Sequence, residues 1–190
     1  YIVNGSMNMN ISKIGNDGDI LWKYNYAREC YGFAATTSSN DGGYIQIGNG
    51  DSTPVAIKID YFGNKIWKKT YENIDDINKI IESKGEGYLI SGRDKNDNGP
   101  TTRLMKIDYN GSLVWNINYS NSYNDSMIQV TDKGFMIAGW SYGYIEGQVE
   151  RGGMDLYLMK IDNKGKIEWE RLFGGTLNDY ATDVIQSKDG

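Results

Sequence analysis

Apolar and polar residues alternate along the chain in short runs that stop at glycine-containing turns. The runs VAIKID (residues 55–60) and KIWKKTY (residues 65–71) are rich in β-branched and aromatic residues, and a short segment with Asp60 and Gly63 separates them. Two such runs around a glycine turn predict a β-hairpin in which the glycine takes a positive φ. A second tight turn, written NDGG, KGEG, TDKG or SKDG, follows a further short run in each case. The pattern predicts antiparallel strands along the chain.

The hairpin phrase occurs four times, as KIGNDGDILW, KIDYFGNKIW, KIDYNGSLVW and KIDNKGKIEW. An aromatic-aliphatic run precedes each copy, as YIVNG, YIQIG, YLISG or FMIAG. The Trp, the turn Gly and an aromatic residue four positions past the Trp recur as Trp22, Trp67, Trp115 and Trp169, as Gly18, Gly63, Gly111 and Gly165, and as Tyr26, Tyr71, Tyr119 and Phe173. A repeat of this kind predicts one structural unit per copy. We divide the chain, a single domain of residues 1–190, into the units 1–43, 44–87, 88–134 and 135–190.

Each unit encodes four strands in antiparallel succession, and both faces of the predicted sheet carry apolar residues. In the second unit, Val55, Ile57 and Ile59 share one strand, and Trp67 and Tyr71 lie on the next. A sheet of this size cannot cover two apolar faces by itself, so the units must stack on one another. Radial stacking of four-stranded sheets gives a β-propeller, whose blades are about 40–50 residues long. The sequence therefore predicts an all-β propeller of four four-stranded antiparallel blades, with part of a larger propeller as the alternative.

The two ends of the sequence read as parts of one repeat. Joining the terminal SKDG to the initial YIVNG recreates the internal pattern KGEGYLISG. We therefore expect the ring to close within the chain, with the segment around Val184 and Ile185 completing the sheet that Tyr1 begins. The alternative is that the four repeats belong to a longer ring or to a pair of chains.

Composition removes several classes of function. The chain contains no histidine, which excludes Ser-His-Asp and Cys-His catalysis and histidine metal sites. Its net charge is −5 and its lysines are spread out, so no nucleic acid is expected as a partner. No apolar run approaches the roughly 18 residues that cross a bilayer, so no membrane insertion is expected. The lone Cys30 cannot form an intramolecular disulfide; a small buried hydrophobe is the favoured interpretation and a free thiol the alternative.

The fourth unit resembles a known repeat. The string GGMDLYLMKIDNKGKIEWERLFGGTLNDYATDVIQSKDG, residues 152–190, is similar to the DGGY-type repeat of secreted and cell-surface proteins of bacteria and archaea, which are mostly uncharacterised. The likeness covers all four units and is poorest in the first, where Gly15 replaces the Asp of the phrase. It implies a propeller fold and an extracellular or cell-surface location, and it implies no activity.

One segment has part of a calcium-binding pattern. RDKNDNGP, residues 93–100, places Asp94, Asn96 and Asn98 at alternate positions before the glycine of a sharp turn. Met105 stands where such a loop has a bidentate glutamate, so the ligand set would be short. A solvated turn is the favoured interpretation. No cofactor is expected, and Ca²⁺ at these three residues is the alternative.

The longest insertion in the repeat, residues 141–155, follows Trp140, which is the one Trp outside the repeated phrase. Loops on a rigid scaffold concentrate binding residues, and Trp and Tyr rings suit both sugar rings and polypeptides. The candidate binding residues are Trp140, Tyr142, Tyr144 and Glu146. A surface hairpin without a ligand explains the insertion equally well.

These observations favour a non-catalytic recognition or scaffolding module that binds a glycan or a protein. One alternative is a carbohydrate-active envelope enzyme with paired carboxylates, for which Asp76, Asp125 and Asp179 occupy related places in three units. Repetition favours a structural role for them, because a catalytic acid and its base need different environments. No catalytic residue is therefore assigned. The other alternative is a structural spacer in a longer array.

Overall fold

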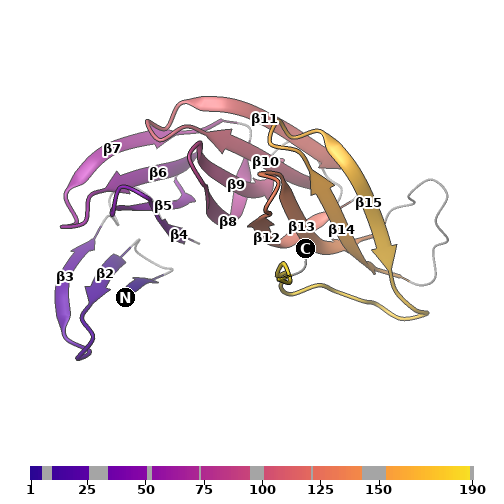
Figure 1. Cartoon of the computed structure of the whole chain (residues 1–190), viewed down its shortest axis with the longest axis horizontal. Helices are drawn as coiled ribbons and strands as arrows, with labels where there is room; N and C mark the ends of the chain where they lie inside the picture. The colour runs from indigo at the N-terminus through magenta and orange to yellow at the C-terminus, as the bar shows by residue number, and fades with distance from the viewer. Residues whose placement is uncertain are drawn as a thin grey trace.

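The structure is a computed structural model of the chain and describes residues 1–5, 10–25, 34–50, 53–72, 74–94, 101–120, 122–142 and 153–188. The described residues form four antiparallel sheets, each built from strands consecutive in sequence (Figure 1). The first sheet contains β1 (Ile2–Gly5), β2 (Asn10–Ile14) and β3 (Ile20–Asn25). The second contains β4 (Ala34–Ser38), β5 (Tyr44–Asn49), β6 (Pro54–Ile59) and β7 (Lys65–Thr70). The third contains β8 (Asp75–Ser83), β9 (Gly87–Arg93), β10 (Thr101–Ile107) and β11 (Leu113–Ser120). The fourth contains β12 (Tyr123–Gln129), β13 (Phe135–Ser141), β14 (Asp155–Ile161) and β15 (Ile167–Phe173).

The predicted all-β propeller architecture is confirmed, with one blade for each repeat. The blades lie side by side along an arc, with β4, β8 and β12 on its inner side and β3, β7, β11 and β15 on its outer side (Figure 1). The first blade has three described strands, in the order β1-β2-β3, and each of the other blades has four.

Closure of the ring within the chain is not observed, which corrects the expectation from the sequence. Figure 1 shows an open arc with the two ends of the chain apart. The segment after β15 returns to its own blade, where the Ala181 amide donates to the Gly139 carbonyl and Ser126 Oγ donates to Asp183. Val184 and Ile185 therefore border the fourth blade, and they do not complete the sheet that Tyr1 begins.

The repeated phrase forms the outer hairpin of each blade. In all four hairpins the repeated Lys pairs with the repeated Trp, and the register shifts directly after the Lys. The turn glycines take a positive φ, as in Gly63 at 88° and Gly111 at 77°. The carboxylate of Asp108 accepts hydrogen bonds from the Asn110 and Ser112 amides at 2.9 and 2.7 Å, and Asp60 and Asp162 do the same in their hairpins. These three aspartates therefore stabilise their hairpin turns by accepting local backbone hydrogen bonds.

The hydrophobic core lies between the blades. Separate clusters of buried side chains fill the space between the first and second sheets, the second and third, and the third and fourth. For example, Ile45 and Ile47 of β5 pack with Ile90 of β9. Burial of both faces of each inner blade therefore depends on its neighbours, as the sequence predicted.

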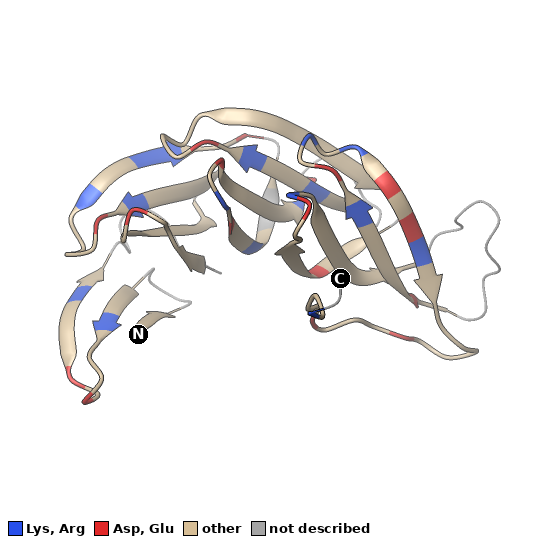
Figure 2. Cartoon of the chain, in the orientation of Figure 1, with Lys and Arg blue, Asp and Glu red and all other residues tan. Residues whose placement is uncertain are grey.

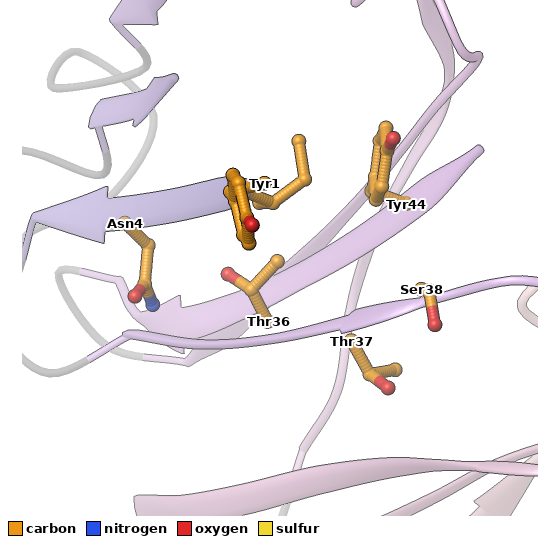
Figure 3. A pocket seen from close by; sticks show the side chains of 7 residues that line it. Tyr1, Asn4, Thr36, Thr37, Ser38 and Tyr44 are labelled. Carbon is orange, nitrogen blue, oxygen red and sulfur yellow. The ribbon is translucent and has the colours of Figure 1, made fainter. Parts of the chain in front are cut away.

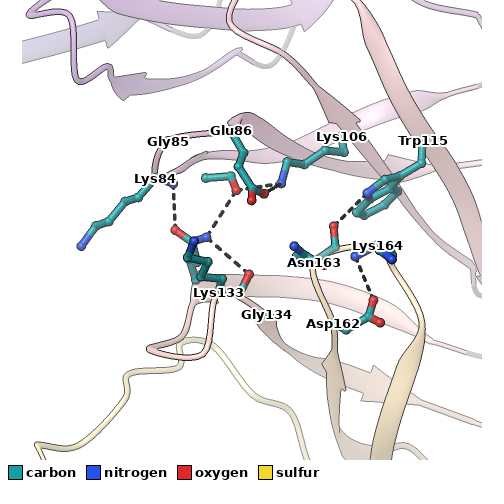
Figure 4. Close-up of polar contacts among 12 residues, drawn as sticks. Lys84, Gly85, Glu86, Lys106, Trp115, Lys133, Gly134, Asp162, Asn163 and Lys164 are labelled. Atoms are coloured by element: carbon teal, nitrogen blue, oxygen red, sulfur yellow. Dashed lines mark hydrogen bonds and ion pairs between the residues drawn. The ribbon is translucent and has the colours of Figure 1, made fainter.

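Polar contacts between blades repeat as regularly as the apolar ones. The indole nitrogens of Trp22, Trp67 and Trp115 donate to the carbonyls of Tyr61, Tyr109 and Asn163 in the next blade's hairpin, at 3.2, 3.0 and 3.1 Å. Figure 4 shows the third of these contacts. The buried hydroxyl of Tyr119 donates to the Gly165 carbonyl at 2.6 Å, and Tyr71 makes the equivalent bond to Gly111. Trp22, Trp67 and Trp115 thus lie where two blades meet.

The repeated lysine is buried, and in the second, third and fourth blades its charge is balanced inside its own blade. Lys58, Lys106 and Lys160 each reach a carboxylate in the turn between the two inner strands, at 2.8 to 3.0 Å. Figure 4 shows the pair of Lys106 with Glu86. Hydrogen bonds from the lysine hold the pKa of Glu86 and of Asp132 below its ordinary value. A buried ammonium group needs such a partner.

Charged residues of both signs are distributed over all four blades (Figure 2). Within the described part of the chain, no helix is long and apolar enough to span a membrane.

Candidate binding site

Four aromatic side chains cluster beside the fourth blade. The rings of Trp140 and Tyr123 stack with centroids 4.1 Å apart and an angle of 28° between their planes. Tyr142 and Tyr180 stand edge-on to Trp140, with centroids 5.3 and 6.0 Å away and an angle of 89° in both contacts. Trp140 and Tyr123 are half-buried, whereas about half of the Tyr142 and Tyr180 side chains is exposed. The arrangement offers two exposed phenol rings on a rigid aromatic base.

Strand pairing sets the geometry of this aromatic cluster. Tyr123 begins β12 and pairs directly with Trp140 near the end of β13, so their side chains lie on the same face of the sheet. Next to this pair, a Cβ at Gly139 would overlap the Tyr123 carbonyl, so β12 and β13 lie closer together here than a side chain would allow. Tyr180 is held by the segment after β15, in which the Ala181 amide binds the Gly139 carbonyl. Three separate parts of the sequence therefore build the cluster.

A guanidinium group borders the cluster from the third blade. One nitrogen of Arg93 donates to the Tyr123 hydroxyl at 3.1 Å, and the guanidinium carbon lies 5.1 Å from the centre of the Tyr123 ring. A cation at this distance is attracted by the ring face. The cluster thus extends from β9 across the blade boundary to β13.

Beside Arg93, the carboxylate of Asp94 is engaged by neighbouring side chains. Asp94 forms an ion pair with Arg103 at 2.8 Å and accepts a hydrogen bond from the Asn118 amide at 3.2 Å. Asn96 and Asn98, the other proposed calcium ligands, lie outside the described residues. No group of three acidic, Cys or His residues that could hold a metal ion occurs among the residues the structure describes.

The structure describes two of the four predicted binding residues. Trp140 and Tyr142 contact each other in the aromatic cluster, whereas Tyr144 and Glu146 lie outside the described residues. Sequence reasoning missed Tyr123, Tyr180 and Arg93. The repeat could have indicated Tyr123, because counting from the turn before Phe135 places it at the start of an innermost strand. No sequence signal connects Tyr180 to Trp140.

The candidate catalytic carboxylates show no paired arrangement in the described part of the chain. Partial burial raises the pKa of Asp125, whereas the Asp179 carboxylate accepts a hydrogen bond from the Gly175 amide at 2.9 Å. The side chain of Asp76 lies outside the described residues. Two cavities of about 460 and 450 Å³ lie at opposite ends of the arc; the first is lined by no carboxylate and the second by that of Asp132.

The fold is similar to known propellers, although no family model and no curated protein matches the sequence. The WD40 domain of Pan2 from Neurospora crassa aligns with a TM-score of 0.61 and 13% identity, over 90% of this chain and 48% of that one. The Dos1 propeller aligns with a TM-score of 0.57 and 11% identity, over 86% and 42%. A Synechocystis apocarotenoid oxygenase aligns with a TM-score of 0.52 and 8% identity, over 90% and 46%. The chain thus spans about half the length of the structures that it matches, and the likeness is one of fold.

Proposed function

We propose that the chain is a non-catalytic recognition or scaffolding module that binds a protein partner through the aromatic cluster of Tyr123, Trp140, Tyr142 and Tyr180. The observation that carries the proposal is the combination of two exposed tyrosines with a rigid base of Trp140, Tyr123 and Arg93. Trp, Tyr and Arg are the residue types that contribute most to binding energy at protein interfaces. Preorganised rings also lose little conformational freedom on binding.

The ring geometry favours a polypeptide over a sugar. A sugar stacks on an open aromatic face, but one face of Trp140 is covered by Tyr123 at 4.1 Å. Tyr142 and Tyr180 meet Trp140 edge-on, and about half of each residue is exposed. Such a surface suits apolar side chains flanked by backbone hydrogen-bonding groups. The resemblance to the DGGY-type repeat supports an extracellular or cell-surface setting for this binding.

A two-library screen tests the proposal. The purified chain is presented to a displayed peptide library and to a glycan array, with Tyr142→Ala, Tyr180→Ala and the control Phe62→Ala alongside. Phe62 is 69% exposed and lies in the β6–β7 hairpin, away from the cluster. We expect selected peptides to bind, the two tyrosine variants to weaken binding at least about tenfold, and the control to bind as the parent chain does.

Two outcomes would count against this function. Glycan binding that is lost in Tyr142→Ala, without peptide binding, would make the aromatic cluster a sugar site. Peptide binding that survives both tyrosine substitutions would place recognition elsewhere on the molecule.

A further inference from the structure

We propose that Asp155 and Asp179 bind a calcium ion where the start of β14 meets the segment that follows β15. This site uses none of the four rings of the aromatic cluster, and it is distinct from Asp94, which belongs to the partial calcium pattern in the sequence. Two carboxylates border one point in space, one of them is buried without a partner, and the third blade has no acid at the same position.

Asp155 is the first residue of β14, and its side chain lies on the face that packs against the third blade. Side chains alternate between the two faces of a strand. Tyr157 and Met159 belong to the hydrophobic cluster that fills the boundary between the third and fourth blades, so Asp155 shares their face. Asp155 is 5% exposed. The carboxylate is therefore buried at a boundary between two described blades.

One oxygen of the Asp155 carboxylate has no partner. Oδ1 is buried and accepts no hydrogen bond from the described residues. An ionised carboxylate in such a place is unfavourable unless an opposite charge or hydrogen-bond donors compensate it. Buried polar groups of native proteins are paired as a rule, and a bound ion is one way in which the pairing is completed. The unpaired oxygen therefore points to a ligand, and its negative charge points to a cation.

Asp179 brings a second carboxylate to the same point from the segment after β15. A Cβ built on Gly174 would lie 1.9 Å from Asp155 Oδ1 and 3.1 Å from Asp179 Oδ2. Both oxygens thus border one small volume beside Gly174. Calcium–oxygen bonds are about 2.3–2.6 Å long, so an ion in this volume is within reach of both carboxylates.

Hydrogen bonds hold the two carboxylates in place. The Asp179 amide donates to the Met154 carbonyl at 2.7 Å, and the Asn178 side-chain oxygen accepts the Met154 amide at 3.0 Å. Asp179 Oδ2 also accepts the Gly175 amide at 2.9 Å. The ligands are thus preorganised, which lowers the cost of binding. Two like charges held together in this way repel one another, and a cation between them turns repulsion into attraction.

The third blade shows that the fold does not require an acid at this position. Thr101 begins β10 as Asp155 begins β14, and the two strands stand in the same register with the strand that follows each of them. The Thr101 hydroxyl accepts the Asp94 amide at 3.5 Å, so this buried side chain has a local partner. Asp155 therefore takes the position of a structural threonine and carries a charge that the strand itself does not need.

The ligand chemistry selects calcium. Carboxylate oxygens suit hard cations, and the chain has no histidine and a single cysteine with which to bind a softer metal. Calcium takes about 6–8 oxygen ligands in a flexible arrangement, so water and backbone carbonyls can complete a set that two carboxylates begin, whereas magnesium demands near-ideal octahedral geometry. With two charged ligands we expect a dissociation constant of about 10⁻⁴–10⁻³ M, at the weak end of the range for protein calcium sites.

The larger cavity beside β1 offers no comparable ligands. It is lined by side chains such as Asn4, Thr36 and Tyr44, and no acidic side chain lines it (Figure 3). A cation in this cavity of about 460 Å³ would meet no compensating charge. The calcium site is therefore defined by its charge and not by the size of a cavity.

A bound ion would join the segment after β15 to the fourth blade. Asp179 immediately precedes Tyr180, whose ring stands edge-on to Trp140. Calcium holds this segment at the start of β14, so we expect the amides of residues 174–180 to exchange at least about threefold more slowly in its presence. This effect does not depend on peptide binding at the aromatic cluster.

Calcium titration of the metal-free chain tests the proposal. We expect calorimetry to show binding, and the thermal midpoint of unfolding to be about 3–8 °C higher in about 10 mM Ca²⁺ than in EDTA. Asp155→Asn and Asp179→Asn should each weaken binding at least about tenfold and remove most of the shift in midpoint. The matched control is Asp125→Asn, because Asp125 stands in the position of Asp179 in the preceding repeat, where Thr101 takes the place of the second acid. This control should bind calcium as the parent chain does.

Stability without metal separates a calcium site from a structural carboxylate. In EDTA, Asp155→Asn should unfold at the temperature of the parent chain or above it, because the repulsion with Asp179 is gone. In Ca²⁺ the parent chain should be the more stable of the two, and circular dichroism shows that each variant is folded. No calcium-dependent signal in the parent chain, binding that persists in either variant, binding lost in Asp125→Asn, or a midpoint of Asp155→Asn below the parent in EDTA would each overturn the proposal.

Discussion

At the scale of single residues, the hairpin glycines serve two purposes that differ between blades. Gly18 and Gly63 occupy the same turn position with φ of 90° and 88°, which is costly for any residue with a Cβ. A Cβ at Gly18 would meet nothing within 4 Å, whereas one at Gly63 would overlap the Tyr24 ring of the preceding blade. Gly18 is thus required by backbone conformation, and Gly63 by conformation and by the closeness of the blades.

This pair predicts a difference in stability. We expect Gly18→Ala to lower the free energy of unfolding by about 1 kcal/mol through backbone strain. Gly63→Ala should cost a further 1–3 kcal/mol or so, because the Tyr24 and Trp22 rings must move. Urea denaturation of both variants measures the difference. Equal losses of unfolding free energy in the two variants would show that contact with the preceding blade adds nothing to the requirement for glycine at position 63.

The residue roles that the sequence predicted are those set by local conformation. Asp60, Asp108 and Asp162 could be assigned because a turn aspartate bonds to amides two and four residues away. The surroundings of Trp140 could not be assigned, since Tyr123 and Tyr180 reach it through strand pairing and a returning segment. Contacts between distant parts of the chain leave no local pattern.

At the scale of elements, the ion pair of Lys160 with Asp132 connects β14 to the turn between β12 and β13 at 2.8 Å. The hydrogen bond from Lys160 lowers the pKa of Asp132, whereas the unfolded carboxyl titrates near about 3.9. The stabilisation from this pair is therefore complete above the unfolded pKa and is lost as the pH falls through the lower, folded value.

Asp132→Asn should remove this pH dependence. We expect the variant to be about 0.5–1 kcal/mol less stable than the parent at pH 7, a modest effect because the Asp132 side chain is 59% exposed. The difference should shrink as the pH falls toward about 3. Urea midpoints at both pH values measure this difference. The substitution repeated in a Lys160→Met background should show a smaller change between the two pH values, because only the hydrogen bond from the Gly134 amide to Asp132 then remains. A stability difference between Asp132→Asn and the parent that is the same at both pH values would exclude the ion pair as its cause.

The strands were largely predictable because the same pattern of strands and turns occurs four times in the sequence. Each copy of the phrase gives the outer hairpin, and the second turn separates the inner strands. The repeat does not predict which blade a segment at the end of the chain will contact. The segment around Val184 was expected to complete the first sheet of its own chain, but Gln186 binds Thr131 and fixes the segment beside the fourth blade.

At the scale of the whole molecule, stability depends on contacts between neighbouring blades. The second and third blades are covered on both faces, whereas the first and fourth are each covered on one. In such a linear arrangement the end units open more readily than the central ones.

Hydrogen exchange should report this gradient. We expect amides of β9 and β10 to be protected longest and those of β1 and β2 to exchange sooner, by at least about tenfold in rate. Mass spectrometry of peptides from each blade after timed exchange measures the order. Uniform protection of all four blades would contradict the linear arrangement.

The buried lysines have a consequence for how such a molecule can change in length over generations. Because Lys58, Lys106 and Lys160 each find a carboxylate within their own four-stranded blade, such a blade carries its charge balance with it. A gene duplication or deletion of a whole blade would therefore leave no ammonium group without a carboxylate in an apolar setting, and natural selection would meet few electrostatic obstacles to altering the number of blades.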